Sequence, residues 1–149
     1  MLNKDDTLLN ELLSDDNLKI AKQRIKKNKG ASGIDGMEVK ELDEYLSKHL
    51  DEIKEQIRNK KYSPKPVKRV EIPKPDGGVR NLGVPTVVDR FVQQAIAQVL
   101  TPIYEPKFSE SSYGFRPNRC CEMAILKALE FMNDGYQWVV DIDLEKFFD

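Results

Sequence analysis

Residues 67–84, Val-Lys-Arg-Val-Glu-Ile-Pro-Lys-Pro-Asp-Gly-Gly-Val-Arg-Asn-Leu-Gly-Val, carry the clearest fold signal in the chain. The segment from Val67 to Ile72 alternates in side-chain character, as a strand does. Pro75-Asp76-Gly77-Gly78 is a turn signal, and Val79 to Val84 can be the returning strand. We therefore predict a β-hairpin over residues 67–84.

Apolar residues that recur every three or four positions predict helices before the hairpin. The strongest stripe has Glu and Lys residues on its far side and consists of Val39, Leu42, Leu46, Leu50, Ile53 and Ile57. Two shorter helices are expected earlier, around residues 8–13 and 18–25. We expect Asp15-Asp16-Asn17 to cap the second of these and Gly30 to follow its end.

The segment after the hairpin is also mainly helical by its pattern. Thr86 with Asp89 resembles a capping box with Asp in place of Glu, and it predicts a helix as far as about Leu100. We expect Pro102 to open an irregular segment, and Asn118 to cap another helix that stops at residues 133–135. Residues 137–142 then read as a mostly buried strand, which makes the predicted fold class α+β.

Basic residues gather in two stretches of a chain whose net charge is −1. The first stretch runs from Lys19 to Lys29 without an acid, and the second runs from Lys60 to Arg90. Two basic patches on a nearly neutral chain point to contact with a polyanion. Charge alone, however, favours the simpler interpretation of a solvated surface with many salt bridges.

Several classes of protein are disfavoured by composition. Cys120 and Cys121 are adjacent and are the only cysteines, which is neither a disulfide framework nor a metal-ligand spacing. Residues 1–16 are acidic and lack the apolar run of a secretory signal, and no apolar run approaches membrane-spanning length. We expect a reduced, soluble, cytoplasmic protein.

Residues 139–149 run from an apolar stretch directly into acids, Val-Val-Asp-Ile-Asp-Leu-Glu-Lys-Phe-Phe-Asp. A carboxylate at the end of a buried strand is costly unless it is paired or bound to a cation. Oxygen ligands suit Mg²⁺, and Asp141 and Asp143 would share one face of a strand. The pattern alone leaves open a metal site and an ordinary acidic strand end.

Two further motifs offer cations for phosphate. Lys74 and Arg80 flank the turn of the hairpin, where Arg would grip phosphate oxygens in a fork and Lys would act as a point charge. Arg116 lies in Tyr-Gly-Phe-Arg-Pro at residues 113–117, before a predicted helix, a location that suits phosphate binding. The alternatives are a surface hairpin with solvated bases, and an Arg116 that pairs with an acid beside packed aromatic rings.

Together and in this order, the motifs resemble the reverse transcriptases of group II introns and their bacterial relatives. The resemblance covers residues 26–149. Its pieces are Gly33-Ile-Asp-Gly36, Ile72-Pro-Lys-Pro-Asp-Gly-Gly-Val-Arg80 with Leu82-Gly-Val-Pro85, Asp89-Arg90 with Gln93-Gln-Ala95, Tyr113-Gly-Phe-Arg-Pro117, and Asp141-Ile-Asp-Leu-Glu-Lys-Phe-Phe-Asp149. Each piece is modest alone, and five in the right order are highly specific.

The resemblance implies roles for the acidic segment. Asp143 matches the first catalytic aspartate, which would bind two Mg²⁺ ions, and the Leu144 carbonyl would assist it. Asp141 matches no known ligand and is expected to be structural. Phe148 matches the aromatic gate that would collide with a ribonucleotide 2′-hydroxyl and so favour deoxynucleotides.

The resemblance also implies nucleotide and RNA contacts. Lys74 and Arg80 match residues that grip the incoming deoxynucleoside triphosphate, and Arg116 is expected on the nucleotide or template side. The segment from Lys26 to Asp35 matches a lid that lies along template RNA. The residues expected to contact intron RNA or the RNA template with its DNA primer are Lys22, Lys26, Lys27, Lys29, Gly30, Ser32, Lys65, Lys68 and Arg69.

The resemblance predicts a helical N-terminal extension with a basic Gly-rich loop at residues 1–36, fingers at 37–135, and the first palm strand with its catalytic motif at 136–149. A second carboxylate pair of the Tyr-x-Asp-Asp type is not found in the sequence. We therefore expect a truncated piece that does not extend a primer by itself. Its exposed apolar stretch at residues 138–142 would favour self-association.

Two other identities share these features. A non-catalytic RNA-binding maturase module would keep the fingers without the chemistry, and the presence of Asp143, Lys74 and Arg80 argues against it. A reverse transcriptase of a diversity-generating or CRISPR-associated system would share the core motifs. The Gly-Ile-Asp-Gly loop fits the intron type better without excluding that alternative.

Overall fold

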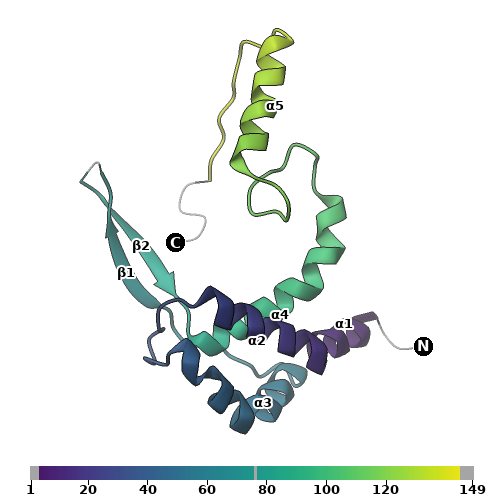
Figure 1. The fold of residues 1–149 in the computed structure, drawn as a ribbon, viewed down its shortest axis with the longest axis vertical. Helices are drawn as coiled ribbons and strands as arrows, with labels where there is room; N and C mark the ends of the chain where they lie inside the picture. Colours follow the sequence, from purple (N-terminus) through teal and green to yellow (C-terminus); the bar gives the residue numbers. More distant parts are fainter. Residues whose placement is uncertain (1–3, 76, 145–149) are drawn as a thin grey trace. The chain divides into compact units, whose positions relative to one another are not determined.

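The computed structural model describes residues 4–75 and 77–144 and divides into two compact units. The first unit is Met1–Ile103 and the second is Tyr104–Asp149. Helices and one two-stranded antiparallel sheet make up the described part, which confirms the α+β class (Figure 1). The unit boundary lies inside the range 37–135 that the sequence assigns to the fingers, and the proposed division into domains stays a prediction.

Two helices open the first unit, α1 (Lys4–Leu12) and α2 (Asp15–Asn28), as the sequence predicts. The expected cap of α2 is wrong by one residue. Ser14 has the extended backbone of an N-cap, and its Oγ accepts a hydrogen bond from the Asn17 backbone N–H at 3.3 Å. Asp15 and Asp16 instead lie in the first turn, where the helix dipole favours negative charge.

The long apolar stripe forms a short 3-10 turn, η1 (Val39–Glu41), followed by helix α3 (Leu42–Arg58). The Glu41 carboxylate accepts from the Glu38 backbone N–H at 2.7 Å and so completes a capping box at this start. The stripe buries Leu42, Leu46 and Ile53. The polar far side of α3 stays exposed, as a 3.6-residue period requires.

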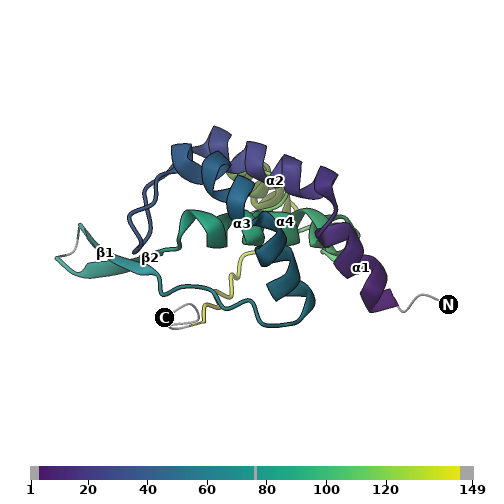
Figure 2. The same ribbon diagram turned by 90° about the horizontal axis from the view of Figure 1, so that it is seen from below.

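The predicted hairpin is formed by β1 (Lys68–Pro73) and β2 (Val79–Val84). The two strands are antiparallel, with Lys68 opposite Val84, Val70 opposite Leu82 and Ile72 opposite Arg80. Both strands are exposed along almost their whole length, and the hairpin projects from the helices of its unit (Figures 1 and 2).

Helix α4 (Val87–Tyr104) begins where the Thr86 cap predicts. The expectation that Pro102 would end it is wrong, because the helix continues for two residues beyond this proline. A proline removes one backbone hydrogen bond, and in the last turn of an 18-residue helix this loss interrupts little.

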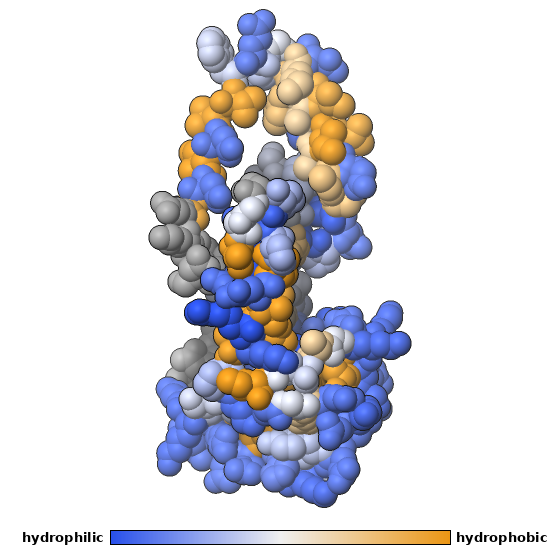
Figure 3. Space-filling model, turned by 90° about the vertical axis from the view of Figure 1, so that its left-hand side faces the viewer, coloured by the Kyte–Doolittle hydropathy of each residue, from blue (hydrophilic) through white to orange (hydrophobic). Residues whose placement is uncertain are grey.

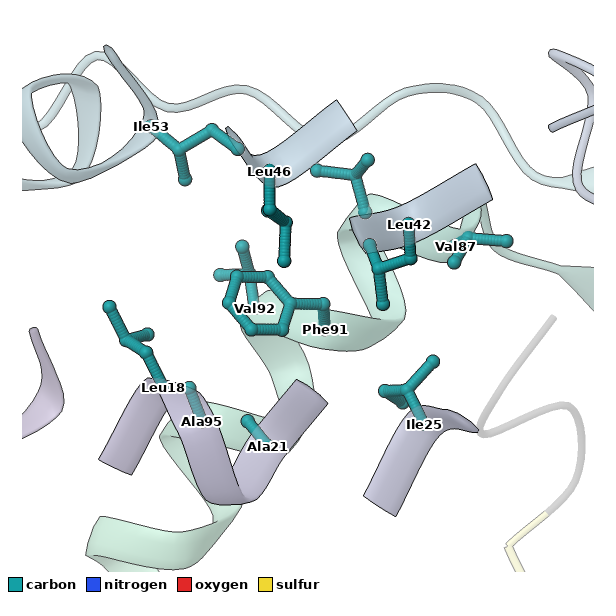
Figure 4. Close-up of a cluster of buried hydrophobic side chains, with 11 residues drawn as sticks. Leu18, Ala21, Ile25, Leu42, Leu46, Ile53, Val87, Phe91, Val92 and Ala95 are labelled. Carbon is teal, nitrogen blue, oxygen red and sulfur yellow. The ribbon is translucent and has the colours of Figure 1, made fainter. Parts of the chain in front are cut away.

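The core of the first unit is built from α2, α3 and α4. Phe91 of α4, which is 1% exposed, lies among side chains of α2 and α3 (Figure 4). The labelled members of this cluster are Leu18, Ala21, Ile25, Leu42, Leu46, Ile53, Val87, Phe91, Val92 and Ala95. Because α2 belongs to this core, residues 15–28 fold together with the segment after residue 37.

The second unit contains a 3-10 turn, η2 (Glu105–Lys107), and helix α5 (Cys121–Asn133). Asn118 does not cap α5, since its φ of 58° lies in the left-handed region and an N-cap needs extended backbone. Cys120 occupies that position, with φ −144° and ψ 169°. The helix stops at Asn133, and Gly135 follows with φ 94°, so the predicted end is confirmed.

The strand expected at residues 137–142 is not formed in the structure. Within the described part of the chain, the only sheet is the β1–β2 hairpin. Trp138 is 94% exposed, and Val139, Val140 and Ile142 are 82–83% exposed, so this segment is also not buried (Figure 3). A strand needs a neighbouring strand to satisfy its backbone groups, and the described residues of this unit offer none.

Candidate nucleic-acid interface

The turn of the hairpin places two cations close together in the chain. It is closed by the Lys74 backbone N–H, which donates to the Gly78 carbonyl at 2.7 Å, and by the Gly77 N–H, which donates to the Lys74 carbonyl at 3.1 Å. Lys74 and Arg80 are both exposed, and neither side chain has an ion pair with another described residue. The predicted positions on either side of the turn are therefore confirmed, and two charges are available to a ligand.

One face of the hairpin combines apolar and basic side chains. Because side chains alternate along a strand, Val70, Ile72, Leu82 and Arg80 share a face through the cross-strand register. Val70, Ile72 and Leu82 are 37–45% exposed, and Figure 3 shows orange side chains beside blue ones on the hairpin. This face offers apolar contact next to a guanidinium, a combination that can bind the apolar part of a ligand and its phosphate together.

The base of the hairpin is organised by Asp89, which is 3% exposed. Its Oδ1 accepts from the Tyr62 hydroxyl at 2.7 Å. Its Oδ2 accepts from the Thr86 hydroxyl at 2.6 Å and from the Lys65 backbone N–H at 3.2 Å. The Asp89 N–H in turn donates to the Thr86 Oγ1 at 3.1 Å, so Thr86 caps α4 as predicted. The buried carboxylate is thus satisfied by three donors.

Tyr62 gives this network a measurable pH dependence. Burial, followed by the hydrogen bond to Asp89, raises the pKa of the Tyr62 hydroxyl well above its usual value of about 10. The protonated phenol therefore stabilises the fold below pH 10, and that contribution is lost as pH rises through the folded-state pKa.

We predict that Tyr62→Phe lowers the free energy of unfolding by about 1 kcal/mol at pH 7 and that this difference shrinks above pH 10. The wild-type chain loses its phenol contribution at alkaline pH, whereas phenylalanine has nothing to ionise. Urea unfolding of both proteins between pH 7 and 11 measures the difference. A gap that stays constant across this range would contradict the linkage to Tyr62.

The glycine-rich loop, residues 30–36, is packed onto the start of α4. A Cβ added to Gly33 would lie 2.6 Å from the Thr86 Cα, so only glycine fits there without a backbone shift. The Arg90 Nη2 donates to the Ala31 carbonyl at 2.7 Å. The Asp35 carboxylate accepts from the Met37 backbone N–H at 3.3 Å and from the Lys65 Nζ at 3.2 Å. These contacts hold the loop against the segment that leads into the hairpin.

The lysines predicted to contact RNA in α2 and at its C-cap fall into two groups. Lys22 and Lys26 both pair with Asp43 of α3, and the hydrogen bonds from Lys26 and then Lys22 lower the pKa of the Asp43 carboxyl. Lys27 and Lys29 are exposed and pair with no acid among the described residues. Of the predicted RNA contacts at the end of this helix, Lys27 and Lys29 are therefore the two without an ion pair to a described residue.

The other predicted RNA contacts lie near the hairpin base or in the loop. Lys65 pairs with Asp35, while Lys68 and Arg69 begin β1 with exposed side chains and no ion pair to a described residue. Gly30 has φ 105°, and an added Cβ would meet the tip of Arg90 at 2.6 Å. Ser32 is half-buried in the same loop. Lys68 and Arg69 add two exposed positive charges at the start of β1, one on each face of the strand.

Arg116 is used inside its own unit. Its Nε and Nη2 donate to the Glu105 Oε1 at 3.0 and 2.8 Å, and its Nη1 donates to the carbonyls of Ser109 and Ser112 at 2.7 and 2.9 Å. The guanidinium also lies 5.2 Å from the centre of the Phe108 ring, and the side chain is 8% exposed. This geometry matches the alternative of an acid pair beside aromatic rings, and it favours a loop-organising role over nucleotide contact.

Asp143 lies in the second unit as an exposed residue, and its Oδ1 accepts from the Leu144 backbone N–H at 2.9 Å. Its carboxylate and neighbouring carbonyls are the oxygen donors that Mg²⁺ prefers. Among the described residues, however, no three His, Cys, Asp or Glu side chains are grouped closely enough to hold a metal ion. The described residues therefore supply only some of the ligands that a bound Mg²⁺ ion would need. Phe148 lies outside the described residues.

The sequence did not indicate the tertiary contacts of four polar side chains that organise the units. These residues are Asp43, Asp89, Arg90 and Glu105. Each one binds a partner that is distant in sequence, by 59 positions between Arg90 and Ala31 and by 27 between Asp89 and Tyr62. Only the local Thr86–Asp89 spacing gave a signal, and it indicated a helix cap alone. No helix in the described residues is long and apolar enough to cross a membrane.

Comparison with known families defines the class of protein. Residues 72–149 match the family described as reverse transcriptase (RNA-dependent DNA polymerase), and the match covers more than half of the chain. The chain belongs to this reverse transcriptase family. Enzymes of the family use divalent metal ions. The matched segment starts in β1 and takes in Lys74, Arg80, Asp89 and Asp143.

Curated relatives narrow the class further. The chain is 36% identical to the group II intron-encoded protein LtrA of Lactococcus lactis, over 93% of this chain and 23% of LtrA. It is 34% identical to the putative COX1/OXI3 intron 1 protein of Saccharomyces cerevisiae, over 99% of this chain and 17% of that protein. It is 37% identical to protein YkfC of Escherichia coli, over 82% of this chain and 34% of YkfC. The resemblance to group II intron reverse transcriptases and maturases is thus confirmed, and the chain spans about a third or less of these relatives.

Proposed function

We propose that this chain forms the fingers and the first catalytic carboxylate of an enzyme that copies RNA into DNA and also binds its intron RNA to assist splicing. The observation that carries the proposal is the exposed hairpin with Lys74 and Arg80 beside its turn. This hairpin lies inside the segment that matches the reverse transcriptase family.

The hairpin would bind the incoming deoxynucleoside triphosphate. The Arg80 guanidinium would form a forked contact with phosphate oxygens, and the Lys74 ammonium would add a point charge. The apolar side chains of Val70, Ile72 and Leu82 on the same face as Arg80 would lie against a base or sugar. The guanidinium, the ammonium and the apolar side chains together would favour a nucleotide over a simple anion.

Asp143 would serve as one ligand of the divalent ions that the family uses, with Mg²⁺ as the ion we propose. When bound, such ions activate a primer 3′-hydroxyl and stabilise the leaving pyrophosphate. This chain would contribute the Asp143 carboxylate oxygens and the Leu144 carbonyl as ligands. Phe148 is proposed as the aromatic gate that favours deoxynucleotides.

RNA would lie along the end of α2, the glycine-rich loop and the start of β1. The exposed cations of these segments that have no ion pair to a described residue are Lys27, Lys29, Lys68 and Arg69, and such cations attract phosphate backbones. Lys68 and Arg69 point to opposite faces of β1, so one of the two would face the RNA. We call this surface the basic strip. Intron RNA, or an RNA template paired with a DNA primer, is the proposed partner.

We predict that Lys27→Ala/Lys29→Ala weakens RNA binding and flattens the plot of log affinity against log salt by about 1.5, because two phosphate contacts are lost. Fluorescence anisotropy with a labelled single-stranded RNA between 50 and 300 mM salt measures both quantities. The matched control is Lys40→Ala/Lys48→Ala, which removes the same charge from lysines already paired with Glu38 and Glu44.

The control separates a specific surface from net charge. If both double variants weaken binding equally, the RNA responds to total charge and the basic strip has no special role. If the wild-type chain does not bind RNA at any of these salt concentrations, the proposed RNA partner is wrong. The expected result is a normal slope for the control and a flatter slope for Lys27→Ala/Lys29→Ala.

A further inference from the structure

Both ends of the hairpin are joined to one carboxylate. Lys65, whose backbone N–H donates to the Asp89 Oδ2, lies three residues before the first residue of β1. Thr86, whose hydroxyl donates to the same oxygen, lies two residues after the end of β2. Tyr62 adds a bond to the Asp89 Oδ1 from the loop that follows α3. Asp89 itself is fixed in the first turn of α4, next to the core.

We propose that Asp89 is a positioning residue that sets the direction of the hairpin, and with it Lys74 and Arg80, relative to helices α3 and α4. The relevance of this role to nucleotide binding rests on the proposed function. The mechanical role stands on the geometry of the first unit alone.

The hairpin has few other contacts that could orient it. Among the described residues, the buried core cluster takes no member from residues 67–84. Val70, Ile72 and Leu82 are all more than a third exposed. A two-stranded hairpin without a covering layer is marginally stable on its own. The polar contacts at its base must therefore supply most of what fixes its angle.

The links between the base and the strands are stiff. Lys65 lies between Pro64 and Pro66, and Pro85 separates Val84 from Thr86. Each proline fixes its own φ near −65° and restricts the residue before it. A constraint at Asp89 is thus transmitted to both strands through short segments with little freedom, so losing it should affect the hairpin as a whole.

Two substitutions at residue 89 separate the hydrogen bonds from the negative charge. In Asp89→Ala, all three donors lose their acceptor. In Asp89→Asn, the amide oxygen can still accept from Lys65 and Thr86, and the amide N–H₂ can donate to the Tyr62 hydroxyl, which also accepts. We call the hydrogen bonds from Tyr62, Lys65 and Thr86 to residue 89 the clamp. The clamp should therefore be lost in the alanine variant and persist in the asparagine variant.

The test measures the distance distribution between spin labels by pulsed electron paramagnetic resonance. One label is attached at Glu71→Cys on β1 and the other at Asp51→Cys on α3, in a Cys120→Ser/Cys121→Ser background. Both labelled positions are exposed and belong to the first unit. We expect a narrow distribution with Asp89 and with Asp89→Asn, and a clearly broader one with Asp89→Ala. An equally narrow distribution in a folded Asp89→Ala chain overturns the proposal.

A second variant keeps the test decisive if Asp89→Ala does not fold. Tyr62→Phe combined with Asp89→Asn removes one bond of the clamp while Thr86 still caps α4. We expect a broader distribution than for Asp89→Asn alone, and an unchanged width overturns the proposal. Circular dichroism of each labelled chain shows which variants retain their helices.

A second readout links the clamp to its ligand. Inorganic tripolyphosphate is titrated into the unlabelled chain, and the amide shifts of the hairpin are followed by NMR. Asp89→Ala should weaken binding on the order of three- to tenfold, with the wild-type strength regained in Asp89→Asn, because ordering Lys74 and Arg80 becomes part of the binding cost. If the hairpin loosens but the wild-type chain does not bind tripolyphosphate, the clamp stands and the nucleotide role of the hairpin fails.

Discussion

Phe91→Ala is expected to lower the free energy of unfolding of the first unit by about 3–5 kcal/mol, the usual cost of removing a fully buried aromatic ring. Phe91 is 1% exposed and is among the largest fully buried side chains in the described residues. It lies between Leu18 and Ala21 of α2 and Leu46 of α3 (Figure 4). Its removal would leave a cavity at the point where three helices meet.

Urea unfolding followed by circular dichroism measures this loss, and a cost of that size approaches the whole stability of a small domain. Phe115→Ala is the control, because this substitution makes the same chemical change at a fully exposed position in the second unit. It should change stability by less than about 0.5 kcal/mol. If Phe91→Ala destabilises the chain as little as Phe115→Ala does, α2 and α3 do not share a core with α4.

Gly33→Ala is expected to cost about 1–3 kcal/mol through overpacking. The new Cβ would lie 2.6 Å from the Thr86 Cα and 2.8 Å from the Thr86 nitrogen. Both are backbone atoms at the start of α4, so no side-chain rotation can relieve the contact. The loop must move away from α4 or the cap of the helix must shift, and either change weakens the contacts around Asp89.

The matched control for Gly33→Ala is Gly114→Ala, because an added Cβ at Gly114 meets no atom within 4 Å. Thermal unfolding of the two variants compares a crowded glycine with an open one. The expected order is a clear fall in melting temperature for Gly33→Ala and almost none for Gly114→Ala. A wild-type melting temperature for Gly33→Ala would mean that the loop does not pack on Thr86 as described.

Local patterns predicted the regular elements well. The alternation and turn chemistry of residues 67–84 placed the hairpin, and the stripe from Val39 to Ile57 placed α3, because both signals lie within a few neighbouring residues. The family motifs also identified Lys74, Arg80 and Asp143 as candidates. Their roles in the reaction remain predictions, since Lys74 and Arg80 lie in one unit and Asp143 in the other.

Tertiary contacts and element ends were harder to predict. Nothing in the basic run of α2 shows that Lys22 and Lys26 pair with Asp43, because that pairing depends on how α2 packs on α3. Pro102 was expected to end α4 because proline usually breaks helix interiors. It lies in the last turn of α4, where it does not end the helix. The strand expected at residues 137–142 was inferred from apolar content, but a strand also requires a partner strand.

The fastening of the glycine-rich loop has a consequence for how this protein family can vary. Surface loops usually accept insertions and deletions. Here Ala31 is held by Arg90, Gly33 rests on Thr86, and Asp35 is bonded to Lys65. The backbone of a loop held at three points within five residues cannot absorb a change in length. Adding or deleting a residue there would break at least one of these contacts. Its length should therefore be as constant among working sequences as the length of a buried helix.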